Sequence, residues 1–533
     1  IHFDKKLKTN TELPNFKNED LRQRQFLSGY SIEDLELILH PMVEDGKEAT
    51  GSMGDDTPVA VLSNHYRPIS HYFRQNFSQV TNPPIDSLRE NKVMSLKTRF
   101  GNLGNILNFD NLTEENIYVL DSPILSNSQF DKFIKYFGSN YKILDCTFNE
   151  KENLEIALNF LKLEAEKSVR EGIKQIILTD KNISKEKLPM PILLCIGAIN
   201  THLIKLGLRG YVSINVQTGD ALDTHSFATL IGVGATTVNP YLAFDSLYQR
   251  YEKKLFGKLN FDECISRYIK SVNLGLLKIM SKMGISVLSS YRGGCNFETV
   301  GLSRTIVKEY FPGVLSKISG IGLTGIEKKV RNIHEEAFKS SSNILPIGGI
   351  YRYRKNGETH QYQAKLIHLL QASVAEKSYD IYKKYVKGIY DLNPISLRDL
   401  VDFKIKNPIN IEKVEPISNI LKRFGSGSMS HGALSKEAHE TLAIGMNRIK
   451  GASCSGEGGE DEERFKVMNN GDSANSRVKQ IASARFGVTI NYLNNCNEIE
   501  IKIAQGAKPG EGGQLPGFKV TDEIAKLRHS TPG

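Results

Sequence analysis

Three cationic residues in the last part of the chain could together hold a small molecule with two carboxylates. Lys502 lies in an alternating stretch, Glu498–Gln505, which we expect to be a strand. Lys508 lies in the glycine-rich loop that follows, and Arg528 comes in the next helical stretch. Each carboxylate would gain charge-assisted hydrogen bonds from these groups. A single lysine at a strand end is usually just solvated. A binding site for a dicarboxylate therefore requires elements that bring the three cations together.

Those elements are expected to be successive parallel strands that end in loops of small residues. Arg423–Ser430 is predicted to be the first strand with its loop, and a second strand runs into the loop Ser453–Gly459. In a (β/α)₈ barrel, reactive groups lie at the carboxyl ends of the strands. Glycine-rich loops there let backbone N–H groups approach a flat cofactor or an anion. One such loop is usually only a turn, but the two glycine–glutamate loops, Gly456–Glu460 and Gly510–Gly513, favour a functional role.

The rest of the chain supports an α/β fold. Between residues 101 and 390, short apolar strands alternate with amphipathic helices, which predicts parallel α/β layers. Ser435 is the predicted N-cap of a helix that ends at Ile449. The other predicted strands are Ile117–Leu120, Tyr141–Asp145, Gln175–Thr179 and Tyr211–Val216, and the other predicted helices are Leu154–Glu171, Pro191–Leu206, Phe261–Met283 and Ala364–Gly388.

Composition excludes several classes of protein. The formal net charge is only +9 over 533 residues, and no nucleic-acid-binding signature is present, so no nucleic acid partner is expected. The longest apolar stretch, Met190–Ile199, is half the length that a membrane span needs, so no membrane partner is expected either. Six scattered cysteines without a C-x-x-C pair predict a reducing compartment. The histidines lack the spacing of metal ligands, so no metal site is expected.

A weaker signal suggests a dinucleotide site. Gly232-Val-Gly234 follows an apolar run, as in a dinucleotide-binding turn. The third glycine is missing, because position 237 is Thr, and an ordinary structural turn is the more frequent explanation.

Longer motifs resemble the large chain of glutamate synthases. The runs Arg423–Ser435, Ser455–Asp461 and Lys502–Gly517 closely resemble the start of that family's flavin domain. Gly51–Pro58 and Ser290–Gly293 resemble upstream landmarks. The resemblance implies a connector from an amidotransferase domain over residues 1–100, a central α/β domain over 101–390, and the first part of an FMN-binding (β/α)₈ barrel over 391–533.

The family's reaction defines the expected activity, that of an oxidoreductase. The resemblance implies reductive transfer of glutamine-derived ammonia to 2-oxoglutarate through 2-iminoglutarate, which gives L-glutamate. The implied cofactors are FMN and a 3Fe-4S cluster, and the electron donor is ferredoxin or an NADPH-oxidising subunit. The chain is rich in Lys, Ile and Asn, as in AT-rich genomes. We therefore expect a ferredoxin-dependent plastid form, with a bacterial cytoplasmic form as the alternative.

The resemblance also assigns roles to individual residues. It implies catalytic roles for Lys508 and Glu440. The residues that it implies for binding 2-oxoglutarate are Lys502, Lys508, Gln514 and Arg528. The residues that it implies for contacting the flavin are Ser428, Met429, Ser430 and Glu457.

The departures from the family pattern predict a fragment. The amidotransferase domain, the later barrel strands and the cluster-binding cysteines do not occur between Ile1 and Gly533. We expect the chain alone to bind FMN weakly or not at all, and to have no turnover. The alternative function is a non-catalytic structural module between the amidotransferase and flavin domains.

Overall fold

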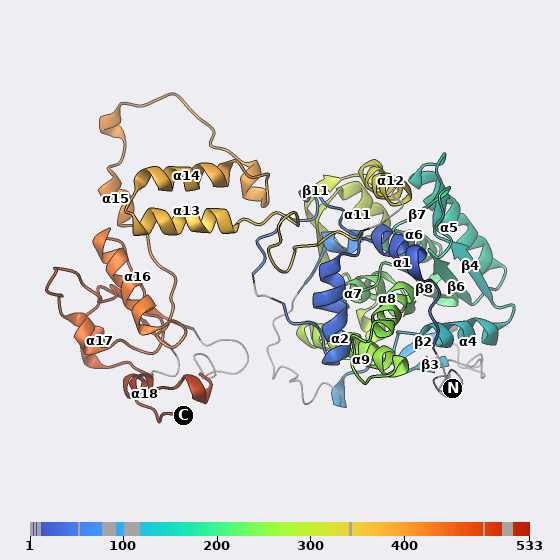
Figure 1. Ribbon diagram of the computed structural model, residues 1–533, viewed down its shortest axis with the longest axis horizontal. Coiled ribbons are helices and arrows are strands. Elements are labelled where there is room, and N and C mark those ends of the chain that lie inside the picture. The colour runs from blue at the N-terminus through green and yellow to red at the C-terminus, as the bar shows by residue number, and fades with distance from the viewer. Residues whose placement is uncertain are drawn as a thin grey trace. The chain divides into compact units, whose positions relative to one another are not determined.

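The computed structural model describes two compact units of the chain (Figure 1). The described residues are 4, 7, 12–51, 54–76, 92–100, 118–339, 344–482, 486–503 and 515–533. Unit 1 comprises residues 1–78 and 85–402, and unit 2 comprises residues 79–84 and 403–533. The domain boundaries at residues 100 and 390 stay predictions.

A parallel sheet of four strands organises unit 1. Its strands are β4 (Tyr141–Asp145), β6 (Gln175–Thr179), β8 (Ser213–Gln217) and β9 (Thr237–Asn239), in the order β4-β6-β8-β9. β6 is buried along its whole length, as expected for a central parallel strand. The predicted strands at 141–145 and 175–179 are confirmed with the same bounds.

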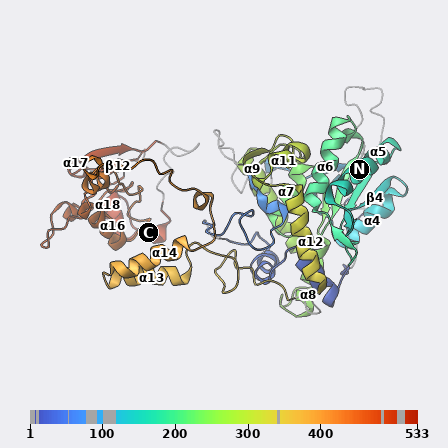
Figure 2. The same ribbon diagram turned by 90° about the horizontal axis from the view of Figure 1, so that it is seen from above.

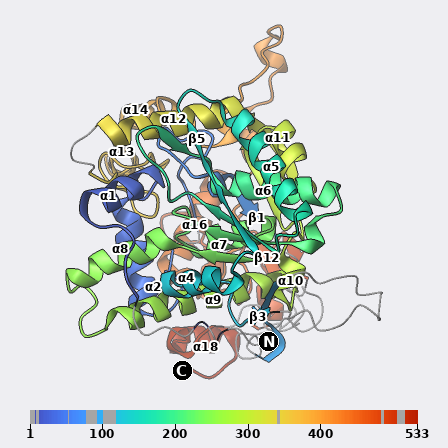
Figure 3. The ribbon, with the colours of Figure 1, turned by 90° about the vertical axis from the view of Figure 1, so that its right-hand side faces the viewer.

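Helices cover both faces of this sheet (Figures 1 and 3). Successive side chains of a strand point to opposite faces. Ile176 and Leu178 belong to the large apolar core that includes the crossover helices, whereas Ile177 packs with Phe130 and Phe133 on the other face. The crossover helices are α5 (Leu154–Arg170), α6 (Ile192–Lys205) and α7 (Thr224–Val233), and the opposite face carries α4 (Asn127–Phe137).

The N-terminal segment contributes to the same core. Leu39, Met42 and Val43 are buried in the large apolar cluster. They lie in a π-helical turn, Asp34–Leu39, and in α2 (His40–Glu44), which follow α1 (Asn18–Leu27). A second sheet has the order β1-β10-β11. Its strands are β1 (Phe73–Gln75), β10 (Phe297–Leu302) and β11 (Leu315–Ile321).

The remaining elements of unit 1 include one correction. The predicted single helix over 364–388 is wrong, because it is two helices, α13 (Ala364–Ala375) and α14 (Tyr379–Tyr390). Lys377 has a φ of 50° between them, and the Ser378 side chain caps α14. The other elements are α8 (Tyr241–Glu252), α9 (Phe261–Met283), α10 (Leu288–Tyr291), α11 (Arg304–Tyr310), α12 (Leu323–Lys339), β2 (Thr98–Phe100), β3 (Tyr118–Leu120), β5 (Thr147–Asn149) and β7 (Lys187–Pro189).

Unit 2 contains a run of parallel segments in chain order. Gly425 pairs with Ala452, Cys454 pairs with Val478, and β12 (Val478–Ile481) pairs with β13 (Glu498–Ile501). Successive parallel strands of this kind occur in (β/α)₈ barrels, and the barrel itself stays a prediction. The described residues do not close such a barrel. The strand expected over residues 423–430 is corrected, because only Gly425 forms a β-bridge there. The strand β12 was not predicted at all.

Helices connect and flank these segments (Figure 2). Ser435 caps α16 (Lys436–Arg448) by accepting a hydrogen bond from the Ala438 backbone N–H at 3.2 Å, as predicted. Lys436 of α16 and Glu523 of α18 (Asp522–Arg528) form an ion pair at 3.1 Å. The helices are α15 (Ile417–Leu421), α16 (Lys436–Arg448), α17 (Ile490–Asn494) and α18 (Asp522–Arg528). Across the part of the chain that the structure describes, no helix is long and apolar enough to cross a membrane.

Candidate functional site

The carboxylate of Glu500 joins the four parallel segments of unit 2. Ser428 Oγ donates a hydrogen bond to Glu500 Oε1 at 2.6 Å, Gln480 Nε2 donates to the same oxygen, and Cys454 Sγ lies 3.8 Å from it. The hydrogen bond from Ser428 is the main cause that holds the pKa of Glu500 below its usual value. Ser428, Cys454 and Gln480 each follow or end a different segment, so side chains from successive segments meet at one edge.

Lys502 extends this edge to the loop after the second segment. Lys502 Nζ donates to Glu457 Oε1 at 2.7 Å, and the Glu457 side chain is only 10% exposed. Among the described residues, the other carboxylate oxygen of Glu457 is buried and has no hydrogen-bond partner. We call these residues the strand-end rim: Ser428, Cys454, Glu457, Gln480, Glu500 and Lys502.

Arg528 approaches the same loop from α18. Its guanidinium donates to the backbone oxygen of His431 at 3.1 Å and lies 4.8 Å from the ring centroid of Phe486. A Cβ at Gly458 would lie 3.0 Å from Arg528 Nη2, so the loop backbone and the guanidinium are in close contact. Burial lowers the pKa of Arg528, and the charge of Glu457 opposes that shift. Lys502 and Arg528 therefore both reach the loop 456–458.

The first loop also packs against the second. Gly456 has a φ of 64°, and a Cβ there would lie 2.5 Å from the carbonyl carbon of Met429 and from the nitrogen of Ser430. Only glycine allows this approach without a shift of the backbone. Met429 keeps 37% of its surface exposed. The expected flavin contacts Ser428, Met429 and Ser430 thus lie beside the Glu457 loop.

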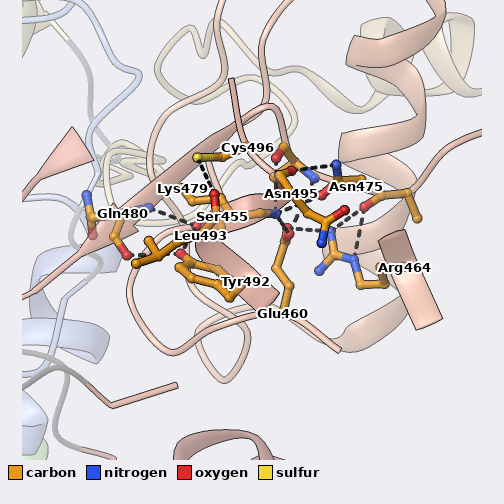
Figure 4. Close-up of polar contacts among 12 residues, drawn as sticks. Ser455, Glu460, Arg464, Asn475, Lys479, Gln480, Tyr492, Leu493, Asn495 and Cys496 are labelled. Atoms are coloured by element: carbon orange, nitrogen blue, oxygen red, sulfur yellow. Dashed lines mark hydrogen bonds and ion pairs between the residues drawn. The ribbon is translucent and has the colours of Figure 1, made fainter. Parts of the chain in front are cut away.

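A buried ion network lies beneath the rim (Figure 4). Glu460 forms ion pairs with Lys479 and with Arg464, the latter at 3.0 Å, and all three side chains are almost fully buried. Lys479 Nζ also donates to Asn475 Oδ1 at 2.7 Å. Because buried charges are costly unless they are paired, this network fixes the geometry of the loop after Gly459.

Histidine and tyrosine side chains link the network to the rim. Arg464 Nη1 lies 2.6 Å from His439 Nδ1, and His439 Nε2 lies 3.0 Å from the Ser455 backbone oxygen. Burial and the Arg464 charge lower the pKa of His439 and favour the neutral ring. Ser455 Oγ lies 2.6 Å from Tyr492 Oη, which donates to the Gln480 backbone oxygen at 2.9 Å. Gln480 in turn contacts Glu500.

The predicted site residues fall into three groups. Lys502, Glu457, Arg528 and the loop 428–430 are brought together. Glu440 lies on α16, where its charge helps to raise the pKa of Lys436, and no hydrogen bond or ion pair in the described structure joins it to the rim. Lys508 and Gln514 lie outside the described residues.

Three residues of the rim, Cys454, Gln480 and Glu500, were not predicted as site residues, and the whole ion network was missed. The alternation over 498–502 places Glu500 and Lys502 on one face of β13, so Glu500 could have been found from that pattern. Gln480 could not have been found from such a pattern, because its strand, β12, was not predicted.

The rim fits the edge of a flat ring such as that of FMN. It offers a hydroxyl on Ser428, an amide on Gln480 and an ammonium on Lys502, each now bonded to a carboxylate. A Cβ at Gly427 would meet nothing within 4 Å, which leaves open space beside the first loop. These residues could therefore hold the polar edge of the ring.

The glycines at 232 and 234 do not form a dinucleotide turn. Gly232 lies inside α7, and a Cβ there would be 2.5 Å from the Phe297 ring. Gly234 follows the helix with a φ of 151°. The side chain of Phe297 fills the space that a phosphate would need, so the dinucleotide interpretation is wrong.

Comparison with known proteins identifies relatives along the whole chain. Residues 23–303 match the family described as glutamate synthase central domain, and residues 360–533 match the conserved region in glutamate synthase. The chain is 53% identical to the glutamate synthase (NADPH) large chain of Azospirillum brasilense, over 100% of this chain and 36% of that one. It is 41% identical to the ferredoxin-dependent glutamate synthase of Pyropia yezoensis, over 96% of this chain and 35% of that one.

The chain spans about a third of the length of these curated relatives. Among solved structures, a mutant flavocytochrome b2 with pyruvate bound aligns at 10% identity and a TM-score of 0.28, over 56% of this chain and 97% of that one. That likeness is too low to indicate the fold. The central-domain match alone covers more than half of the sequence, and the rim lies within the second matched region. The chain therefore belongs to the glutamate synthase family.

Proposed function

We propose that this chain is part of a glutamate synthase large chain, an oxidoreductase that reductively transfers glutamine-derived ammonia to 2-oxoglutarate through 2-iminoglutarate and gives L-glutamate. The observation that carries the proposal is the convergence of Lys502 and Arg528 on the loop 456–458. Two cations at one loop suit a substrate with two carboxylates. The family match supplies the reaction class.

The rim residues act by binding and orienting the substrate. A substrate carboxylate that reaches Lys502 competes with Glu457, whose carboxylate now occupies the ammonium. Arg528 is partly desolvated, so a second carboxylate there gains more than it would at an exposed arginine. We propose that Lys508 and Gln514 line the same site and that Lys508 and Glu440 take part in catalysis, as the family pattern implies.

The cofactors belong to the same proposal. Ser428, Gln480 and Lys502, with Met429, Ser430 and Glu457 around them, would hold the edge of FMN. When bound, FMN supplies the hydride that reduces the imine. Ligands for the 3Fe-4S cluster would come from outside these 533 residues.

The relatives bear on the proposed electron donor and compartment. We expected a ferredoxin-dependent plastid form. The chain is 53% identical to an NADPH-type bacterial large chain and 41% identical to ferredoxin-dependent chains, including the chloroplastic one of Spinacia oleracea. This difference favours the alternatives, an NADPH-oxidising subunit as donor and the bacterial cytoplasm as compartment.

Unit 1 favours the second candidate, a structural module, for its own part of the chain. In parallel α/β sheets, ligands bind at the carboxyl ends of the strands. Here Asp180, after β6, accepts hydrogen bonds from Thr218 Oγ1 at 2.6 Å and from the Gly219 backbone N–H at 3.0 Å. Tyr30 Oη donates to the Gly219 oxygen at 3.0 Å. The protein's own groups fill this end of the sheet.

The test is Lys502→Met in the complete protein. Loss of one charge-assisted hydrogen bond of about 1.5–3 kcal/mol should raise the KM for 2-oxoglutarate about tenfold to a hundredfold. Glutamine hydrolysis should not change. Lys519→Met, at an exposed lysine nearby, is the matched control.

The double variant Lys502→Met/Glu457→Gln separates binding from folding. It leaves no unpaired buried carboxylate, so its thermal midpoint should return toward that of the wild type while the KM stays high. An unchanged KM in both variants would remove Lys502 from the site and support the structural module instead.

A further inference from the structure

Unit 1 contains a cavity of about 550 Å³ that none of the site residues above line. Small-molecule sites usually have volumes of this order, about 300–1,000 Å³. Its walls come from the end of α1 with the following turn, from the segment Ser63–Arg67, from α12 and from the loop Pro346–Glu358. The part of the wall on α12 and the loop lies between the two regions that match the family.

The loop wall is held in place by many polar contacts. The Glu33 carboxylate accepts hydrogen bonds from the backbone N–H groups of Ile350 at 2.6 Å and Arg352 at 2.9 Å. Gly348 has a φ of 87°, and a Cβ there would lie 2.6 Å from Ser31 Oγ. The loop therefore cannot collapse into the cavity without breaking these contacts.

Two cations line the cavity with unused hydrogen-bonding capacity. The Arg67 side chain is only 6% exposed, and its Nη2 donates to Glu358 at 2.8 Å. Its Nε is buried and has no hydrogen-bond partner among the described residues. Lys329 Nζ donates to the Tyr72 hydroxyl at 3.0 Å, and no carboxylate pairs with it in the described structure. Burial and then the charge of Arg67 lower the pKa of Lys329.

The acidic residues of the wall do not supply the missing partner. Glu358 is engaged by Arg67, by Ser63 Oγ at 2.7 Å and by the Thr359 backbone N–H at 2.9 Å. Asp34 accepts from the Ser31 hydroxyl at 2.6 Å and from the Ser31 backbone N–H. Glu336 is exposed to solvent. An anionic ligand in the cavity would supply a partner for the Lys329 ammonium.

We propose that this cavity binds a small organic carboxylate, held by the Lys329 ammonium, with the Arg67 guanidinium as a second positive charge on the wall. The apolar side chains of Phe26, Ile333 and Ile347 on the wall receive its carbon skeleton. The site belongs to unit 1 and does not depend on the function proposed for the rim.

Isothermal titration of the 533-residue chain tests the proposal. The probes are succinate, citrate, L-glutamate and inorganic phosphate. We expect at least one of the three carboxylates to bind, and Lys329→Met to weaken that binding at least tenfold. Lys328→Met, at the adjacent exposed position of α12, is the matched control and should bind as the wild type does.

Two further variants decide the remaining outcomes. Ile347→Trp fills the cavity from a half-exposed position and should also abolish binding, which keeps the test valid if Lys329→Met does not fold. Lys502→Met removes a cation of the rim and should leave this binding unchanged. Absence of carboxylate binding, binding that survives both Lys329→Met and Ile347→Trp, binding lost in Lys502→Met, or binding of phosphate alone would each overturn the proposal.

Discussion

The two units are stabilised by different kinds of interaction. The three apolar core clusters among the described residues all belong to unit 1. Unit 2 buries few hydrophobic side chains, and the charged side chains of Glu460, Lys479 and Arg464 are among its most buried groups. Isoleucines at every second position of β13 are exposed, and Ile501 keeps 78% of its surface in solvent. In (β/α)₈ barrels in general, helices cover the outer face of each strand, and in the predicted barrel Ile499 and Ile501 would lie on that face.

This difference has a consequence for function. A polar network can hold side chains of the rim in fixed positions, because each of its charged groups has a defined partner. It adds little net stability, because the cost of desolvating the charges offsets their attraction. Unit 1 should therefore resist local opening more than unit 2, and hydrogen exchange can measure the two separately.

The largest effect is expected in the core of unit 1. Phe133 is fully buried between Phe130 and Phe137 on α4. Phe133→Ala should lower the free energy of unfolding of unit 1 by about 4 kcal/mol, since it removes a large apolar side chain and leaves a cavity. Hydrogen exchange in β4 and β6 measures the loss. Phe160→Ala on α5, at a ring that is 64% exposed, is the control and should change little.

The second prediction concerns the ion network of unit 2. Glu460→Gln leaves Lys479 and Arg464 buried without their anion, which should destabilise unit 2 by about 3 kcal/mol. Hydrogen exchange should increase in α16 and β12 but not in β6. Glu462→Gln removes an exposed carboxylate two residues away and is the matched control. Equal effects of the two variants would contradict the role given to the network.

The sequence predicted the elements of unit 1 better than those of unit 2. α9 has the predicted bounds, and β4 and β6 do as well, because apolar periodicity marks the helix and a short apolar run marks each strand. β12 was missed because two of its four residues, Lys479 and Gln480, are polar yet buried. Their burial depends on partners far away in sequence, and local patterns do not show such partners.

Site residues could likewise be predicted only where a local pattern marks them. Long motifs around Ser428, Glu457 and Lys502 predicted these residues, and in the structure Ser428 bonds to Glu500 while Lys502 bonds to Glu457. The cavity of unit 1 could not be predicted. Arg67 and Lys329 lie 262 residues apart in sequence, and each alone looks like an ordinary surface cation.

The smallest expected effect is a difference in pH response between the units. Burial, followed by the charge of Asp180, raises the pKa of Asp220 from 3.8 to about 7. A raised acid binds its proton more tightly in the folded state, so stability rises as the pH falls through 7. Between pH 8 and pH 6, the protonation of Asp220 should stabilise unit 1 by about 1 kcal/mol. In unit 2, Glu500 stays ionised over this range, whereas the lowered pKa values of His431 and His439 make unit 2 less stable as the pH falls through 6.5.

Two variants isolate the contribution of Asp220 to this pH response. His71, whose pKa burial lowers to about 4, acts in the opposite direction, so the measurement is the difference between Asp220→Asn and the wild type. Hydrogen exchange in β6 and β8, corrected for the intrinsic effect of pH on exchange, should show that difference. Asp131→Asn, at an exposed position of α4, should respond as the wild type does. If Asp220→Asn keeps the wild-type response, the buried acid of unit 1 is not what distinguishes the two units, and apolar burial alone accounts for their difference.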